Sequence, residues 1–276
     1  MEIRRATADD RQAVMELLSR VWEDDYIPYC WDEWVSDVEN GVPLVALHQG
    51  QIAGVAHIQF LDQRVSWHQA LRIDPDARRL GIGSALARAC LEQTKRHGRQ
   101  VARLLVDAEN LPSLRLTERS GFRRVKHYLK LYKSPPGESG PELLQPSKNL
   151  LPELLQRAVA QGENYWHSRW ETRDLTLAAL KWSLDGGCLR VLADDPAAAL
   201  ADVNQDEDDF EMGQLVGDEE NVVRLVQGLE REAARQGLGQ ICILQTLESP
   251  HLCLLIERLG YRLQADEGYV IWEYQL

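Results

Sequence analysis

Residues 71–83 have the sequence LRIDPDARRLGIG, and this stretch decides the fold. The alternation of Leu71 and Ile73 predicts the end of a strand, and Asp74-Pro75 predicts the turn out of it. From Ser84 onward, apolar residues recur at helical spacing. A strand, a turn, a glycine-containing loop and a helix therefore follow one another in this order.

The loop between this strand and this helix has the composition of an anion site. Gly81 and Gly83 let the backbone turn tightly and approach a ligand. The first N–H groups of the helix have no partner within it, and Arg78 and Arg79 add positive charge. Together they predict a cup for a pyrophosphate. A Rossmann dinucleotide site fits less well, because position 86, where a third glycine is needed, is leucine.

The spacing Arg-x-x-Gly-x-Gly resembles the acetyl-CoA motif of the GNAT N-acetyltransferases. Asn110, followed eleven residues later by Gly121-Phe122, is also similar to the GNAT pattern, in which this Asn and the helix after it lie beside the pantetheine arm. The resemblance implies acetyl-CoA as co-substrate. It assigns to cofactor binding Leu71, Arg72, Ile73, Arg78, Arg79, Leu80, Gly81, Ile82, Gly83, Ser84, Asn110 and Ser113.

The second half of the chain repeats the first. Residues 91–122 and 229–261 share a helix, a glycine-containing turn, an apolar strand, a proline-started helix and a Glu-Arg-x-Gly-aromatic ending. The expected fold class is therefore an α/β (α+β) GNAT fold, with a mixed, mostly antiparallel sheet flanked by helices, in two tandem repeats. We expect a cofactor-binding domain over 1–133, a Pro-, Gly- and Ser-rich linker over 134–148 and a degenerate domain over 149–276.

The second repeat lacks the anion chemistry. Where the first has its arginine pair, the second has GQLVGDEE at 213–220. The acidic side chains of Asp218, Glu219 and Glu220 would repel a pyrophosphate. The acidic run 205–211 is interpreted as a solvated loop rather than a cation site.

Composition limits the classes of partner. The net charge of −12 argues against general nucleic-acid or membrane-surface binding. No apolar run approaches the roughly 18 residues of a membrane span, and the first residues show no hydrophobic signal region. The five cysteines have no metal-ligand spacing, which favours reduced thiols in a cytoplasm and no metal. The resemblance to the GNAT enzymes implies a small-molecule amine as the partner.

The residue that would protonate the departing CoA thiolate is not obvious. Many GNAT enzymes have a tyrosine four residues before the glycine of the Gly-Phe pair, whereas this chain has Thr117. Four possibilities stay open: Thr117, a water, Tyr128 from another strand, or unassisted departure.

The general base is equally open. His68 lies on the predicted strand before the cofactor motif and is the first candidate, against a solvated or strand-edge role. Asp24, Asp25 and Glu33 could act through water, and Asp107 and Glu109 follow the central strand. The resemblance implies that a backbone N–H within residues 71–73 polarises the thioester carbonyl.

An aromatic stretch, DDYIPYCWDEW at 24–34, precedes these elements. Tyr26, Trp31 and Trp34 are candidate walls of the acceptor site, with a cover for the core as the alternative. Tyr26-Ile27-Pro28, Trp34 and the Leu-Arg-Ile-x-Pro motif also resemble the branch containing the vertebrate histidine N-acetyltransferases. That branch implies a free amino acid as acceptor, although its glutamate two residues before Leu-Arg is Gln69 here.

Two hypotheses follow. The first is an acetyl-CoA-dependent N-acetyltransferase that acts directly on the amine of a small molecule, a free amino acid being one class. The second is an acetyl-CoA-binding regulatory module with little turnover.

Overall fold

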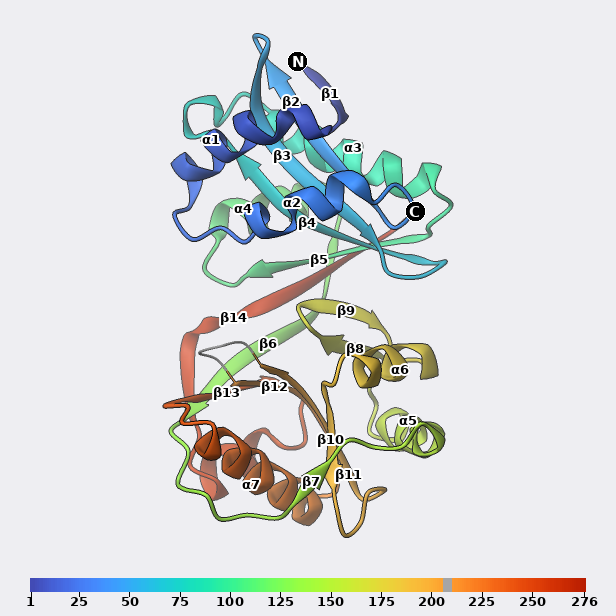
Figure 1. The fold of residues 1–276 in the computed structure, drawn as a ribbon, viewed down its shortest axis with the longest axis vertical. Coiled ribbons are helices and arrows are strands. Elements are labelled where there is room, and N and C mark those ends of the chain that lie inside the picture. Colours follow the sequence, from blue (N-terminus) through green and yellow to red (C-terminus); the bar gives the residue numbers. More distant parts are fainter. Residues whose placement is uncertain (206–209) are drawn as a thin grey trace. The chain divides into compact units, whose positions relative to one another are not determined.

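The computed structural model describes residues 1–205 and 210–276, and its ribbon is drawn in Figure 1. The chain folds into two compact units. Unit 1 comprises Met1–Val106, Asn110–Val125 and Ile271–Leu276, and unit 2 comprises Asp107–Glu109 and Lys126–Val270. Residues 206–209 of the acidic run lie outside the described residues.

Unit 1 is built on a sheet in which β1 to β5 are neighbours in chain order. The strands β1 to β4 pair antiparallel and β4 pairs parallel to β5. Their bounds are Glu2–Arg5 for β1, Gly41–His48 for β2, Gln51–Phe60 for β3, Val65–Ile73 for β4 and Val101–Asp107 for β5.

Helices cover both faces of this sheet (Figure 1). On one face, α1 (Arg11–Val21) and α2 (Ile27–Ser36) pack against Val45, Val55 and Ala70. On the other face, α3 (Ile82–Arg96) packs against Leu44, Ala56 and Ile58. The helix α4 (Leu111–Arg119) begins at Asn110, whose side chain accepts a hydrogen bond from Ser113 N–H. The alternation of side chains along each strand thus feeds two separate cores.

Unit 2 has a sheet of the same kind. Its order is β6, β13, β12, β11, β10, β7. The strand β12 runs parallel to β13, and every other neighbouring pair in this order is antiparallel. The strand bounds are Arg123–Lys133 for β6, Leu143–Leu144 for β7, Leu189–Leu192 for β10, Ala199–Gln205 for β11, Phe210–Gly217 for β12 and Ile241–Thr246 for β13.

The remaining elements of unit 2 lie around this sheet. They are α5 (Leu151–Ala160), the hairpin of β8 (Tyr165–Ser168) and β9 (Glu171–Asp174), α6 (Leu177–Asp185), α7 (Glu219–Arg235) and a π-helical turn (Leu254–Arg258). The helix α7 follows β12 as α3 follows β4, so the repeat predicted from the sequence is present in the fold.

The unit boundaries differ from the predicted segments 1–133 and 149–276. β6 leaves unit 1 after Val125 and pairs with β13 from Tyr128 to Lys133. β14 (Arg262–Gln275) passes in the other direction, because its last residues belong to unit 1, where Glu273 pairs with Arg103 at 2.7 Å. A division by sequence position misses this exchange, since strand pairing does not require neighbours in sequence.

The predicted linker 134–148 is also partly structured. Leu143 and Leu144 form β7 and pair with Leu192 and Val191 of β10. Leu143 further packs against the core that contains Val226 and Leu229 of α7. This segment therefore contributes an edge strand to unit 2.

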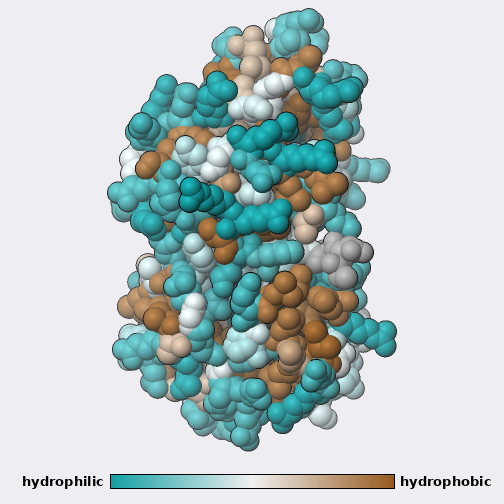
Figure 2. All heavy atoms as spheres, turned by 180° about the vertical axis from the view of Figure 1, so that it is seen from behind, coloured by the Kyte–Doolittle hydropathy of each residue, from teal (hydrophilic) through white to brown (hydrophobic). Residues whose placement is uncertain are grey.

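The surface hydropathy and the cysteine thiols do not indicate a particular function. On the face shown in Figure 2, hydrophilic side chains dominate and hydrophobic ones gather in places. All five cysteines are free thiols. No helix among the described residues is long and apolar enough to cross a membrane.

Candidate active site

Unit 1 contains a cleft with a volume of about 1290 Å³. It is lined by residues from the end of β4, the loop before α3, the exposed side of α3, α4 and the end of β14. The predicted cofactor residues that line it are Leu71, Arg72, Ile73, Arg78, Arg79, Gly81, Ile82, Gly83, Ser84, Asn110 and Ser113.

The cleft begins where β4 and β5 separate. The two strands pair at Val65–Val101, Ser66–Ala102 and Trp67–Arg103, and the ladder does not continue to residues 71–73. Two parallel strands that diverge leave backbone groups without a ladder partner, and an extended ligand can take their place.

β4 carries a bulge at this point. Its register against β3 shifts between Val55 and His57, and Ala70 has φ of 60°. A positive φ is uncommon for a residue with a Cβ and is a source of local strain. A bulge places an extra residue outside the ladder and bends the strand. The backbone around Leu71 is therefore turned away from regular pairing next to the cleft.

The loop after β4 has the backbone and charge expected of the predicted anion cup. Gly81 caps α3 with φ of 83°, a conformation that favours glycine, and it has no side chain that could bond the first N–H groups of the helix. Arg78 and Arg79 are exposed beside it. Leu80 was predicted to bind the cofactor, but it is 54% exposed and is not among the residues that line the cleft. Its side chain points to solvent because the loop turns at its neighbours.

Gly83 leaves space in the cleft because it has no side chain. A Cβ at this position would lie 3.3 Å from Leu116 Cδ2 and 3.8 Å from Ile73 Cγ1. Its absence lets α3, α4 and the end of β4 come together around the cleft.

The far end of the cleft was not predicted from the sequence. It is lined by Arg88 and Leu91 of α3, Arg119 and Ser120 near the end of α4, and Tyr274 of β14. The spacing of Ser84, Arg88 and Leu91 on one helix face could have revealed the first part. Tyr274 packs against Phe122 with ring centroids 5.5 Å apart, and no local pattern connects it with residues about 150 positions earlier in the sequence.

The other end of the cleft meets the segment between α1 and α2. Arg72 donates from Nε to Asp25 Oδ2 at 2.7 Å, and its guanidinium lies 5.3 Å from the Trp22 ring centroid and 5.8 Å from that of Tyr26. Trp22 lines the cleft, although the sequence analysis did not select it.

Two of the three predicted acceptor-site aromatics lie elsewhere. Trp31 is fully buried in the core between α1, α2 and the sheet. Trp34 stacks on His57 with centroids 4.1 Å apart and planes at 5°. Both rings face the sheet because α2 packs its apolar side on it. Tyr26 is 42% exposed and is the predicted aromatic that remains near Arg72.

His68, the first candidate for the base, is a core residue. Its Nε2 lies 2.8 Å from Thr94 Oγ1, and Thr94 Oγ1 lies 2.9 Å from Ser66 Oγ. Burial lowers the pKa of His68 to about 3. His68 faces α3 rather than the cleft, so it is not placed to take a proton from an acceptor.

Thr117 does not line the cleft. It is buried, and the α4 residues that line the cleft are its neighbours Ser113, Leu116, Arg119 and Ser120. Thr117 follows Ser113 by about one helical turn and lies near the same face, so burial rather than helix direction keeps its hydroxyl from the cleft. Tyr128, the alternative acid, is a buried residue of unit 2.

None of the described residues that line the cleft is Asp, Glu or His. Asp24 and Glu33 are exposed, and Asp25 is engaged by Arg72. Asp107 accepts a hydrogen bond from Glu109 N–H, and both belong to unit 2. Among the described residues, no group of three or more His, Cys, Asp or Glu could hold a metal ion.

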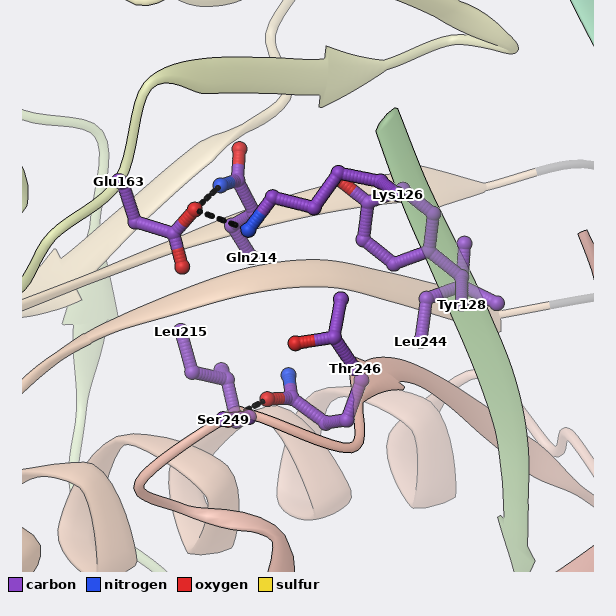
Figure 3. A pocket seen from close by; sticks show the side chains of 9 residues that line it. Lys126, Tyr128, Glu163, Gln214, Leu215, Leu244, Thr246 and Ser249 are labelled. Atoms are coloured by element: carbon purple, nitrogen blue, oxygen red, sulfur yellow. Dashed lines mark hydrogen bonds and ion pairs between the residues drawn. The ribbon is translucent and has the colours of Figure 1, made fainter. Parts of the chain in front are cut away.

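Unit 2 has a small pocket at the matching point of its own sheet. β12 and β13 pair at Phe210–Ile241, Glu211–Cys242 and Met212–Ile243, and Gln214, Leu215 and Leu244 to Thr246 then line the pocket. Its volume is about 10 Å³, roughly the space of one water. Figure 3 shows Glu163 among the residues that line it, where Gln214 donates to Glu163 at 2.9 Å and Lys126 lies 3.3 Å from the same oxygen.

The strand end and helix start of unit 2 are closed as well. Gln161 donates to Gly217 O at 2.9 Å and accepts from Gly217 N–H at 2.8 Å. The side chain of Asp218 caps α7 by accepting from Asn221 N–H. Backbone groups that could bind a ligand are thus bonded within the unit itself.

Comparisons with known proteins agree with this geometry. A model of the acetyltransferase (GNAT) family matches residues 10–122. An uncharacterized N-acetyltransferase of Methanocaldococcus jannaschii is 28% identical over 148 residues, which are 48% of this chain and 66% of that protein. The chain thus matches just under two thirds of that relative's length.

Solved structures show the same fold over the whole chain. A putative acetyltransferase from Thermoplasma acidophilum has a TM-score of 0.67 at 16% identity, with 100% of both chains covered. A tandem GNAT protein from the clavulanic acid biosynthesis pathway has a TM-score of 0.61 at 16% identity, covering 99% of this chain and 98% of that one. Residues 10–122 thus match the acetyltransferase (GNAT) family, and the whole chain has the fold of these acetyltransferase structures, one of which is a tandem GNAT protein.

Proposed function

We propose that this protein is an acetyl-CoA-dependent N-acetyltransferase that transfers the acetyl group directly to the amine of a small molecule, with free amino acids as the leading acceptor class. The observation that carries the proposal is the cleft of unit 1, where a strand divergence, a bulge and an uncapped helix start meet. A GNAT family match over residues 10–122 covers the elements that build it, except for the end of β14.

The residues present fit acetyl-CoA along the length of the cleft. The uncapped N-terminus of α3, with Arg78 and Arg79, suits the pyrophosphate. Gly83 leaves room for an extended arm, and Asn110 lies on its other side. Arg88, Arg119 and the ring of Tyr274 at the far end suit the phosphorylated nucleoside.

Acetyl-CoA would supply an acyl group already activated as a thioester. We expect a backbone N–H group next to the bulge at Ala70 to polarise its carbonyl. Because no Asp, Glu or His was found in the described lining, we expect rate enhancement to come mainly from positioning, with water removing the amine proton. The acceptor would enter beside Trp22, Tyr26 and Arg72, away from the nucleotide end.

The test is the release of CoA thiol from acetyl-CoA in the presence of free amino acids, polyamines and a peptide. We expect release with one acceptor class, and its loss in Arg79→Glu, which reverses a charge at the anion cup. Acetyl-CoA binding by calorimetry without release for any acceptor would contradict the enzyme and support a binding module.

The matched control is Glu219→Lys, at the start of α7 in unit 2. It should release thiol at the wild-type rate, because this helix start is capped by Asp218 and lies in the unit without an arginine pair. Loss of release in this control would place the working site in unit 2.

A further inference from the structure

The side chain of Arg72 is separated from its neighbours on β4. Leu71 and Ile73 pack against the core beneath α3, whereas Arg72 contacts Asp25, Trp22 and Tyr26 in the segment between α1 and α2. Successive side chains of a strand point to opposite faces. Arg72 was predicted to bind the cofactor, but its side chain lies on the proposed acceptor side of the cleft.

The hydrogen bonds of Arg72 leave one edge of its guanidinium free. A guanidinium has five N–H donors. Nε donates to Asp25 Oδ2 at 2.7 Å, Nη2 donates to Asp25 Oδ1 at 3.3 Å and Nη1 donates to Leu71 O at 3.3 Å. Within residues 1–205 and 210–276 the structure gives Arg72 no other hydrogen-bond partner. One N–H remains on each terminal nitrogen, so the guanidinium keeps two donors for a further ligand, and we call these two donors the fork because a carboxylate can accept both.

The fork is held in place. Asp25 is 1% exposed at its side chain, and its Oδ1 also accepts from Ile27 N–H at the start of α2. The rings of Trp22 and Tyr26 lie against the guanidinium, which favours stacking. The Arg72 side chain is 15% exposed, and Arg72 lines the cleft. Since Asp25 balances its charge, the free edge suits a monoanion better than a phosphate dianion.

We propose that Arg72 binds the carboxylate of the acceptor, which makes the acceptor an amino acid with a free carboxyl group rather than a simple amine or polyamine. The inference rests on the proposed function. In an α-amino acid the amine and the carboxylate are joined through one carbon. A carboxylate on Arg72 therefore holds the amine within a few ångströms of the bulge at Ala70 and Leu71, where the thioester carbonyl is expected. The exposed Trp22 and Tyr26 rings are left to contact the side chain of the amino acid.

The first experiment uses the wild-type protein. CoA release is measured with the most active amino acid of the panel, with its carboxamide and with the amine that lacks the carboxyl carbon. We expect kcat/KM to fall by about 100-fold for both analogues, because each leaves the fork without a charged partner. Equal rates for the acid and its carboxamide would overturn the proposal.

The second experiment changes the fork and keeps the charge. Arg72→Lys retains a cation for Asp25 but cannot offer two parallel N–H groups. We expect the KM for the amino acid to rise by ~10-fold or more, with an unchanged KM for acetyl-CoA and an unchanged rate for the carboxamide. A raised KM for acetyl-CoA with an unchanged KM for the amino acid would show that Arg72 serves the cofactor.

Two controls separate this proposal from folding effects and from the proposed function. The double variant Asp25→Asn, Arg72→Gln leaves no unpaired buried charge, so it should fold. Because it lacks the fork, it should discriminate poorly between acid and carboxamide. If the wild-type protein turns over no acceptor, calorimetry in the presence of CoA compares the binding of L-histidine, L-leucine and L-lysine with that of their carboxamides. This comparison tests carboxylate binding by Arg72 independently of turnover. Preferential binding of an acid that Arg72→Lys abolishes supports the fork, and equal or absent binding of acid and carboxamide contradicts it.

Discussion

Each unit contains a pair of parallel strands that diverge, but the divergence opens a large cleft in unit 1 and only a small pocket in unit 2. In each, two parallel strands pair over three residues and then diverge, at β4–β5 in unit 1 and at β12–β13 in unit 2. The first divergence opens into a cleft of about 1290 Å³ and the second into a pocket of about 10 Å³. The topology creates the opening, and the side chains around it decide whether it remains available to a ligand.

The helix that follows shows the same contrast. α3 starts at Gly81, which leaves its first N–H groups without a side-chain cap, beside Arg78 and Arg79. α7 starts at Asp218, whose carboxylate satisfies Asn221 N–H, with Glu219 and Glu220 in the first turn. A satisfied, acidic helix start is stable by itself and does not attract an anion.

The largest effect is expected for acetyl-CoA affinity when the predicted anion cup of unit 1 is altered. Gly81→Glu adds a side chain at a φ of 83° and a negative charge at the start of α3. Acetyl-CoA affinity should fall ~100-fold, which is about 2.7 kcal/mol. Titration calorimetry measures it, and Glu220→Lys in unit 2 is the control, with affinity within about twofold of wild type. A similar loss in both variants would mean that unit 2 takes part in binding.

A second test concerns the pH dependence of stability, because each unit contains a buried histidine with a lowered pKa. Burial lowers the pKa of His68 in unit 1 to about 3 and that of His167 in unit 2 to about 4. An unfolded chain binds a proton on each below about pH 6.5, and the folded one does not, so stability falls as the pH drops through this window. Each histidine should contribute a slope of about 1.4 kcal/mol per pH unit between about pH 6 and pH 4.5.

Urea unfolding at several pH values measures this slope. His68→Gln keeps a polar side chain beside Thr94 and should reduce the slope by one proton, and His167→Gln should do the same. A variant that leaves the slope unchanged would show that its histidine titrates alike in both states.

The smallest effect is expected for stability, at Tyr128 in the pocket of unit 2. The Tyr128 hydroxyl is buried, and the structure gives it no hydrogen-bond partner among the described residues. Tyr128→Phe removes a desolvated polar atom, so the free energy of unfolding should rise by about 1 kcal/mol. Denaturant unfolding measures it. CoA release should be unaffected, whereas a loss of release would revive Tyr128 as the acid of the reaction.

Local sequence was enough to predict the elements around the proposed anion cup because they are contiguous. Strand, turn, glycines and helix follow one another from Leu71 to Ser84, and eleven of the twelve predicted cofactor residues line the cleft. The misplaced residues are those whose role depends on which way a side chain faces. His68, Thr117 and Trp31 have suitable chemistry at suitable positions, but each is buried.

The sequence alone was enough to predict the repeat and the difference in charge between the two helix starts, since these depend on residue types at short spacing. Only the tertiary structure decided which strand completes which sheet, because β5 and β14 are neighbours in the sheet although they are far apart in the sequence. The ion pair between Arg103 and Glu273 lies between these two strands. It also decided that Tyr274 lines the cleft and that Arg72 presents a free edge on the acceptor side. Such contacts depend on packing between distant segments, which no local pattern records.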